Sequence, residues 1–329
     1  MEFEEFKTKL LEKINKRDSD CLKLIDKNKN LVQEYFTKER MFYVREFIDD
    51  LYEPILNEKK KFKVIEKVLK HPLMKVVLEE FRKSQTLIKI CRDGNNKQAM
   101  LWLLSMDMDQ CVQDKLGRTA LMYLVKQYHV DMIIDEFLKV KGDHYNLTDE
   151  NGNTALFYAT HGAPFVMRKL LKSGLFDYNH LNNKHENILM YNTLVSFELL
   201  MDKPDIDYNV VNNEGKNLAM ILVENGRYNE LMKLNVKKGI DVNYQNQYGE
   251  TLVSIFFKKY HELVSDKSAV FETEKNRFKI QAMSQTLKTL IKLGCDFNRP
   301  IDNEGNTPVM YFLIMEDYHS LQYLIDNCS

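Results

Sequence analysis

The stretch "DNEGNTPVMYFL", residues 302–313, joins a turn to a helix. Gly305 permits the positive φ that a tight turn needs, and Pro308 supplies the fixed φ that suits the first position of a helix. The apolar residues that follow form one side of that helix. The fold of the chain therefore depends on whether this unit occurs once or is repeated.

Copies of the unit recur upstream. They are residues 114–125 ("DKLGRTALMYLV"), 149–160 ("DENGNTALFYAT"), 182–193 ("NNKHENILMYNT"), 212–223 ("NNEGKNLAMILV") and 246–257 ("NQYGETLVSIFF"). The turn positions are 117, 152, 185, 215, 249 and 305, with His185 in place of glycine, and their separations are 35, 33, 30, 34 and 56 residues. Every separation except the last is close to 33, which predicts an array of structural repeats.

Other residue types recur at the same spacing as the turns. The residues that can cap the following helix with a hydroxyl are Thr119, Thr154, Thr251 and Thr307. The glycines that suit the ends of second helices are Gly174, Gly239 and Gly294. An Asp-x-Asn sequence precedes later turns at 177–179, 207–209, 241–243 and 296–298. Each copy is therefore predicted to be two helices and a projecting turn, here called the finger.

This pattern resembles the ankyrin repeat, whose 33-residue unit carries a turn, a Thr-Pro-Leu-His helix start and a second helix. The resemblance covers roughly residues 82–329 and implies an all-α fold, an ankyrin-repeat solenoid of about seven helix-turn-helix repeats. The residues at the histidine position of the motif are Met122, Phe157, Met190, Met220, Ser254 and Met310. We therefore expect looser, more apolar packing between repeats than the motif histidine would give.

Two regions depart from the repeat. Residues 1–81 hold no copy, but their apolar spacing predicts three or four amphipathic helices, with breaks at Pro54 and at His71–Pro72. This N-terminal helical region is either a cap on the first repeat of the array at 82–329 or a separate docking or dimerisation module. The long last interval predicts an insertion at about 261–279, and such insertions often lie on a binding face.

Composition limits the class of partner and the compartment. The net charge is -1, from 47 basic and 48 acidic residues, so no overall field attracts nucleic acid or anionic lipid. No stretch approaches eighteen apolar residues, and the N-terminus is charged from its second residue, unlike a secretory signal. The expected protein is intracellular, cytoplasmic or nuclear, with no direct nucleic-acid binding and no membrane insertion. Its five scattered cysteines, without a CxxC pair, are expected to be reduced and mostly packed.

The chain lacks sequence motifs for catalysis or cofactors. Residues 94–100 have neither the second glycine nor the Lys-Ser/Thr pair of a phosphate loop, and residues 302–306 lack the ligands of a calcium loop. No histidine is placed to activate Cys91 or Cys111 as a nucleophile. The single tryptophan, Trp102, is expected in the core. We predict no catalytic, cofactor-binding or metal-binding residues.

In an ankyrin array the fingers and first helices line a groove that holds another protein. Transferred to this chain, the resemblance places the partner-binding residues beside the finger turns: Lys115, Leu116, Arg118, Glu150, Asn151, Asn153, Lys184, Glu214, Lys216, Tyr244, Tyr248 and Glu250. Tyrosine favours such a role because it combines a large stiff ring with a hydroxyl.

The leading hypothesis is thus a non-enzymatic interaction scaffold or adapter that binds a protein or peptide in the groove. One alternative is a nuclear transcription or chromatin co-regulator that acts through partner proteins, for which the lysines at 59–61 are the sequence support. Another is a substrate adapter of a ubiquitin ligase, which would need a docking element within residues 1–81. The sequence does not determine the oligomeric state.

Overall fold

The computed structural model describes residues 1–57, 62–94, 96–140, 142–191, 194–234, 239–265 and 274–328. Within these ranges the chain is helical, and the only β pairing is an isolated bridge between Val211 and Asn217. The chain divides into two compact units, Met1–Asp177 and Tyr178–Ser329. The predicted all-α class is therefore confirmed.

The N-terminal region contains more helices than predicted. Its described residues form α1 (Phe3–Asn15), α2 (Cys21–Lys27), α3 (Lys29–Tyr35), α4 (Met41–Asp50), α5 (Tyr52–Asn57), α6 (Lys63–Leu69), the 3₁₀ helix η1 (Pro72–Met74) and α7 (Lys75–Arg82). The expectation of three or four helices was wrong because several of these helices have only six to eight residues and are separated by short turns, such as the one at Asn28. Pro54 is not a break either, since it lies in the first turn of α5, where its missing N–H costs no hydrogen bond. The break at His71 is confirmed, because its backbone is extended and η1 begins at the following proline.

The N-terminal helices pack on the first repeat, which consists of α8 (Thr86–Asp93) and α9 (Lys97–Ser105). Trp102 is buried, as predicted, and its ring stacks on Phe62 with 4.7 Å between centroids. The Asn96 side chain, which caps α9, also donates a hydrogen bond of 3.0 Å to the carbonyl oxygen of Leu56. These contacts favour a cap, although the expected boundary after residue 81 falls inside the first unit and the role of residues 1–81 stays a prediction.

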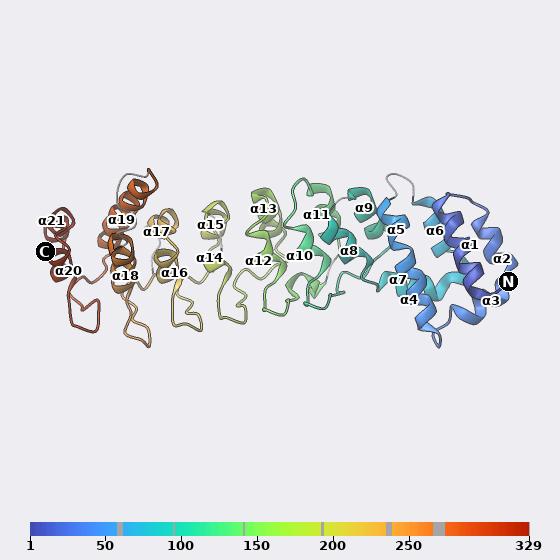
Figure 1. Ribbon diagram of the computed structural model, residues 1–329, viewed down its shortest axis with the longest axis horizontal. Coiled ribbons are helices and arrows are strands. Elements are labelled where there is room, and N and C mark those ends of the chain that lie inside the picture. Colours follow the sequence, from blue (N-terminus) through green and yellow to red (C-terminus); the bar gives the residue numbers. More distant parts are fainter. Residues whose placement is uncertain are drawn as a thin grey trace. The chain divides into compact units, whose positions relative to one another are not determined.

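The remaining repeats are helix pairs that lie side by side within each unit (Figure 1). In the first unit they are α10 (Ala120–Leu124), α11 (Asp131–Phe137), α12 (Ala155–Ala159) and α13 (Pro164–Ser173), with the 3₁₀ helix η2 (Asp143–Asn146). In the second unit they are α14 (Ile188–Tyr191), α15 (Leu194–Met201), α16 (Leu218–Glu224), α17 (Tyr228–Leu234), α18 (Leu252–Ser265), α19 (Glu274–Lys292), α20 (Pro308–Ile314) and α21 (Tyr318–Asn327). Neighbouring first helices contact one another, as α10 does with α8 and α12, and their apolar faces form the core.

The finger turns are equivalent in all six copies. The turn glycines Gly117, Gly152, Gly215, Gly249 and Gly305 all have positive φ, and His185 adopts the same conformation with φ 59°. Three residues before each turn position, an Asp or Asn side chain accepts hydrogen bonds from two backbone N–H groups; Asp149, for example, accepts from Asn151 and Asn153 at 2.9 and 2.7 Å. This acceptor fixes the finger and explains why Asp or Asn recurs there.

Three of the four predicted threonine caps are present. Thr119, Thr251 and Thr307 each accept a hydrogen bond from the backbone N–H three residues later. Thr154 does not, so that prediction was wrong. Its hydroxyl is buried without a partner, because the N–H of Phe157 donates to the backbone carbonyl oxygen of Thr154 instead.

The asparagines that end the fingers tie each repeat to the next. In the second unit, the Asn209 side chain donates a hydrogen bond of 2.6 Å to the carbonyl oxygen of Gly239 and accepts one of 2.9 Å from the N–H of Asp241. Asn243 does the same with Gly294 and Asp296, at 3.2 and 2.8 Å. The equivalent residues with such a pair of bonds are Asn146, in the first unit, and Asn179, in the second. These bonds connect repeats whose motif histidine is missing, so the packing is less purely apolar than expected.

The predicted insertion at 261–279 falls partly in helices. Residues 261–265 end α18 and residues 274–279 begin α19, while residues 266–273 lie outside the described residues. The lysines at 59–61 also lie outside them. A binding role for either segment stays a prediction.

Candidate functional site

Neighbouring fingers contact each other through their backbones. In the first unit, the N–H of Glu150 donates to the carbonyl oxygen of Leu116 at 2.9 Å. A Cβ on Gly117 would lie only 3.0 Å from the Cα of Asp149, so glycine permits this close approach. In the second unit, the N–H of Asn213 donates to the carbonyl oxygen of Lys184 at 2.9 Å. Finger residues of successive repeats are thereby held in fixed register.

A groove opens between the sixth and seventh helix pairs in the second unit. We call it the aromatic groove; its lining residues are Tyr248, Glu250, Ser254, Phe257, Lys258, His261, Glu262, Ile301, Asp302, Asn303 and Tyr311. Its volume is about 520 Å³. Phe257 is buried against Tyr311, with 5.2 Å between ring centroids, whereas Tyr248 is 68% exposed. The groove is therefore lined by the packed aromatic pair Phe257 and Tyr311 and by one largely exposed ring, Tyr248.

Several polar groups of the groove are already hydrogen-bonded, either within the groove or to neighbouring residues. The Tyr311 hydroxyl lies 2.6 Å from Nδ1 of His261, and burial, together with the charge of Asp302, raises the pKa of Tyr311 to about 12. Tyr311 therefore keeps its proton at neutral pH. A hydrogen bond from Asn306 lowers the pKa of Asp302, which is ionised at neutral pH. With Glu250 and Glu262 also present, the carboxylates outnumber the one lysine, Lys258.

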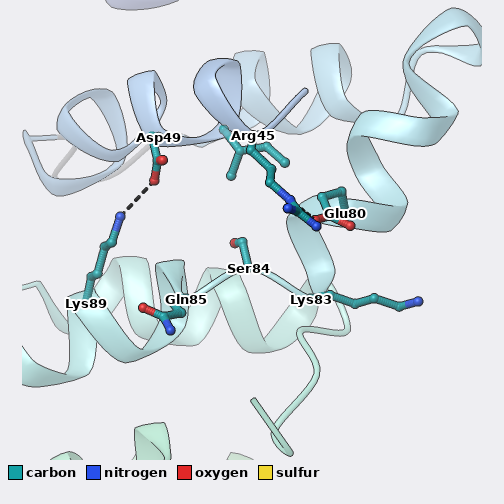
Figure 2. A pocket seen from close by; sticks show the side chains of 8 residues that line it. Arg45, Asp49, Glu80, Lys83, Ser84, Gln85 and Lys89 are labelled. Atoms are coloured by element: carbon teal, nitrogen blue, oxygen red, sulfur yellow. Dashed lines mark hydrogen bonds and ion pairs between the residues drawn. The ribbon is translucent and has the colours of Figure 1, made fainter. Parts of the chain in front are cut away.

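A second cleft lies in the first unit, between α4 and the segment that joins α7 to α8. We call it the polar cleft; its lining residues are Arg45, Ile48, Asp49, Glu80, Lys83, Ser84, Gln85 and Lys89, and its volume is about 420 Å³. Figure 2 shows Lys89 facing Asp49 and Arg45 facing Glu80, and each pair is joined at 2.8 Å. Lys83 points away from the cleft (Figure 2). The charged side chains of the polar cleft mainly neutralise one another, and the cleft offers little apolar surface to a ligand.

A third cluster surrounds Arg118 in the second and third repeats. Tyr123 donates to Asp114 and Tyr158 to Asp149, each at 2.6 Å. The Arg118 guanidinium lies over both rings, 5.9 and 5.7 Å from their centroids. Burial, followed by the hydrogen bond to Asp149, raises the pKa of Tyr158. The cluster braces two adjacent fingers, so Arg118 is less available to a partner than its turn position suggested.

Comparisons with known proteins agree with this geometry. A family profile described as ankyrin repeats in three copies matches residues 87–184, and one described as ankyrin repeats in many copies matches residues 280–325. The chain contains ankyrin repeats. Its ankyrin repeats are the seven helix pairs from α8–α9 to α20–α21 in the described ranges, as the sequence predicted.

Among solved structures, the ankyrin repeat domain of Bcl-3, a unique member of the IkappaB protein family, matches with a TM-score of 0.51 and 19% identity. The match covers 68% of this chain and 92% of that chain, and at this identity it shows the fold alone. A chain from the complex of the Bd0816 predatory endopeptidase from Bdellovibrio bacteriovorus with immunity protein Bd3460 matches with a TM-score of 0.47 and 21% identity, over 55% of this chain and 94% of that chain. No curated protein sequence matches the chain.

The predicted partner-binding residues fall in both units. Those with exposed side chains are Lys115, Leu116, Glu150, Asn151, Lys184, Glu214 and Tyr248; those that are half-buried are Arg118, Asn153, Lys216, Tyr244 and Glu250. The structure brings Leu116 beside Glu150 in the first unit and places Tyr248 and Glu250 in the aromatic groove of the second. Lys216 is held by Glu214 and Glu224, at 3.2 and 2.8 Å. Whether these residues bind a partner stays a prediction.

Sequence reasoning missed the aromatic wall of the groove, formed by Phe257 and Tyr311. A usable signal exists, because a tyrosine follows the Asp or Asn of the finger by nine residues in four ankyrin repeats. The pairs are Asp114 and Tyr123, Asp149 and Tyr158, Asn182 and Tyr191, and Asp302 and Tyr311. This spacing places the ring on the first helix directly behind the finger.

Three further observations concern the described residues. They contain no group of three or more His, Cys, Asp or Glu placed to hold a metal ion. None of their helices combines the length and apolar character needed to cross a bilayer. All five cysteines are unpaired; Cys21, Cys91 and Cys295 are buried as expected, whereas Cys111 and Cys328 are exposed.

Proposed function

We propose that this ankyrin-repeat protein is a non-enzymatic interaction scaffold or adapter that binds a protein or peptide segment in the aromatic groove. The exposed ring of Tyr248, in a groove that the buried Phe257 and the half-buried Tyr311 also line, is the observation that supports the proposal. A partner side chain between these rings would cover apolar surface that is now hydrated, and tyrosines in such positions commonly dominate binding energy.

The charges of the groove define the partner further. Glu250, Glu262 and Asp302 would accept hydrogen bonds from backbone or side-chain donors of the bound segment. The groove lies beside fingers that their own Asx-type hydrogen bonds hold, so little ordering is needed on binding. The proposal includes an intracellular setting, cytoplasmic or nuclear, which the unpaired cysteines favour.

Affinity purification with the intact chain and two matched variants tests the proposal. Tyr248→Asp should reduce the recovery of groove partners by about tenfold, because it removes the ring and adds a charge next to carboxylates. Tyr128→Asp is the control, since Tyr128 lies in the first unit and is also 68% exposed. Equal recovery of every partner by the wild type and the Tyr248→Asp variant would show that the groove is not the binding site.

A further inference from the structure

The last ankyrin repeat has an exposed apolar surface. The surface, here called the end face, consists of Val309, Met310, Leu313 and Ile314 on α20 and Tyr318 and Ile325 on α21. These are six of the fourteen large hydrophobic side chains that are exposed among the described residues. The clustering is informative because single exposed apolar residues are normal, whereas contiguous patches indicate interaction sites.

The preceding repeat shows what kind of structure fits the end face. Phe257 follows the capping residue Thr251 by six positions, as Leu313 follows Thr307, so the two occupy equivalent places on α18 and α20. Phe257 is 2% exposed because α20 covers it, with 4.9 Å between the ring centroids of Phe257 and Phe312. Leu313 is 49% exposed. The end face therefore repeats a surface that is complementary to a helix one repeat earlier.

The charge of the last repeat is unlike that of the rest of the chain. Residues 300–329 contain five acidic residues and no lysine or arginine: Asp302, Glu304, Glu316, Asp317 and Asp326. The remaining residues hold all 47 basic and the other 43 acidic groups of the chain, an excess of positive charge. Glu316 and Asp326 are exposed and adjoin α20 and the Ile325 position of α21. The end face is thus apolar, with two exposed carboxylates beside it.

We propose that the end face docks a basic amphipathic helix of another protein. Its apolar side would cover Leu313, Ile314 and Ile325, and its lysines or arginines would meet the exposed carboxylates, as in other helix recognition by an apolar surface. A second copy of this chain fits less well, because pairing two end faces would bring like charges together. The inference goes beyond the proposed function, since the end face and the aromatic groove have no residue in common.

Three synthetic peptides test the chemistry of the proposal. The probe is a helix of about 18 residues with leucines at i, i+3, i+4 and i+7 and with lysine and arginine on the other side. One control peptide replaces the basic residues by glutamate, and the other replaces the leucines by glutamine. Fluorescence anisotropy with the full chain should show the basic amphipathic peptide binding about tenfold more tightly than either control, with affinity falling as salt is raised.

Variants of the full chain locate the binding. Leu313→Asp, and separately Ile314→Ser as a milder change, should weaken the basic peptide by about tenfold and about threefold, and Glu316→Lys with Asp326→Lys should weaken it by about fivefold. Tyr248→Asp and Tyr128→Asp should leave its affinity within about twofold, which separates this surface from the groove. Circular dichroism and thermal melting confirm that each variant is folded.

Several outcomes would overturn the assignment to a basic helix. Equal binding of all three peptides would indicate unspecific apolar contact, and unchanged binding by both the Leu313→Asp and Ile314→Ser variants would place the peptide elsewhere. Sedimentation of the wild type as a dimer, with Leu313→Asp as a monomer, would assign the end face to a second copy. Loss of peptide binding in the Tyr248→Asp variant alone would assign the peptide to the groove.

Discussion

Helices α18 and α20 begin with the same sequence signals, but their equivalent apolar side chains differ in burial. Each follows a finger and a capping threonine, and each continues with an apolar run. Val253 and Phe257 of α18 are buried, whereas Val309 and Leu313, at the equivalent positions of α20, are exposed. The sequence of an ankyrin repeat therefore determines which side of its helices is apolar. Whether that side is buried depends on whether a neighbouring repeat packs against it.

The largest expected effect comes from the paired substitutions Phe257→Ala and Leu313→Ala. Phe257→Ala should lower the free energy of unfolding by about 4 kcal/mol, because it leaves a cavity between α18 and α20. Leu313→Ala should change it by less than about 0.5 kcal/mol, since this side chain is half exposed. Urea unfolding followed by circular dichroism measures both values. Similar losses in the two variants would show that Leu313 is covered in solution.

A smaller effect is expected at Asp317, which joins α18 to the last repeat. Its carboxylate caps α21 by accepting a hydrogen bond of 3.0 Å from the N–H of Ser320. It also accepts a hydrogen bond of 2.5 Å from the hydroxyl of Tyr260 on α18. Asp317→Ala should cost about 2 kcal/mol, because both the cap and a partner of a half-buried hydroxyl are lost. Thermal unfolding of the variant beside the wild type measures this loss, and an unchanged melting temperature would contradict it.

The same residue gives that stability a defined pH dependence. Burial opposes the ionisation of Asp317, but the hydrogen bonds from Ser320 and Tyr260 outweigh it and lower its pKa below the ordinary 3.8. The unfolded chain therefore takes up the proton first, so the contribution is complete above about pH 5 and is lost as the pH falls through the folded-state pKa. Asp317→Asn should flatten this part of the stability curve between pH 5 and pH 2, a range set by the ordinary carboxyl pKa of about 4.

The smallest effect is expected at the finger asparagines. Asn243 bonds two backbone groups of the loop before the last repeat, whereas the equivalent Asn298 is exposed and its N–H bonds Asp296. Asn243→Ala should cost about 1 kcal/mol and Asn298→Ala less than about 0.5 kcal/mol. Urea midpoints of the two variants give the comparison. Equal midpoints would mean that the bonds between repeats add nothing beyond apolar packing.

Local features of the fold could be predicted from the sequence, because short-range chemistry determines them. The positive φ of Gly305, the cap at Thr307 and the break at His71 each depend on residues within one turn. The predictions that were wrong, on the N-terminal helices and on the Thr154 cap, depended on local backbone contacts that the sequence pattern does not reveal. The apolar spacing of the N-terminal region does not show where short helices end, as α2 and α3 do on either side of Asn28, and Thr154 lost its cap to a competing backbone bond.

The candidate site was harder to predict, because its walls come from different repeats. Tyr248 and Glu250 were found from their place beside a finger, which is a local property. Phe257 and Tyr311 lie far apart in the sequence and meet only when α18 and α20 pack together. The exposure of the end face has the same origin, since it depends on whether a neighbour covers α20.

The finger asparagines also affect how freely the chain can evolve. Each one bonds a carbonyl oxygen and an N–H of the following repeat, and these backbone groups exist whatever amino acid carries them. A mutation in the receiving loop therefore keeps both partners unless it introduces proline or shifts the backbone. Neighbouring repeats can thus accept substitutions independently of one another while their spacing is preserved.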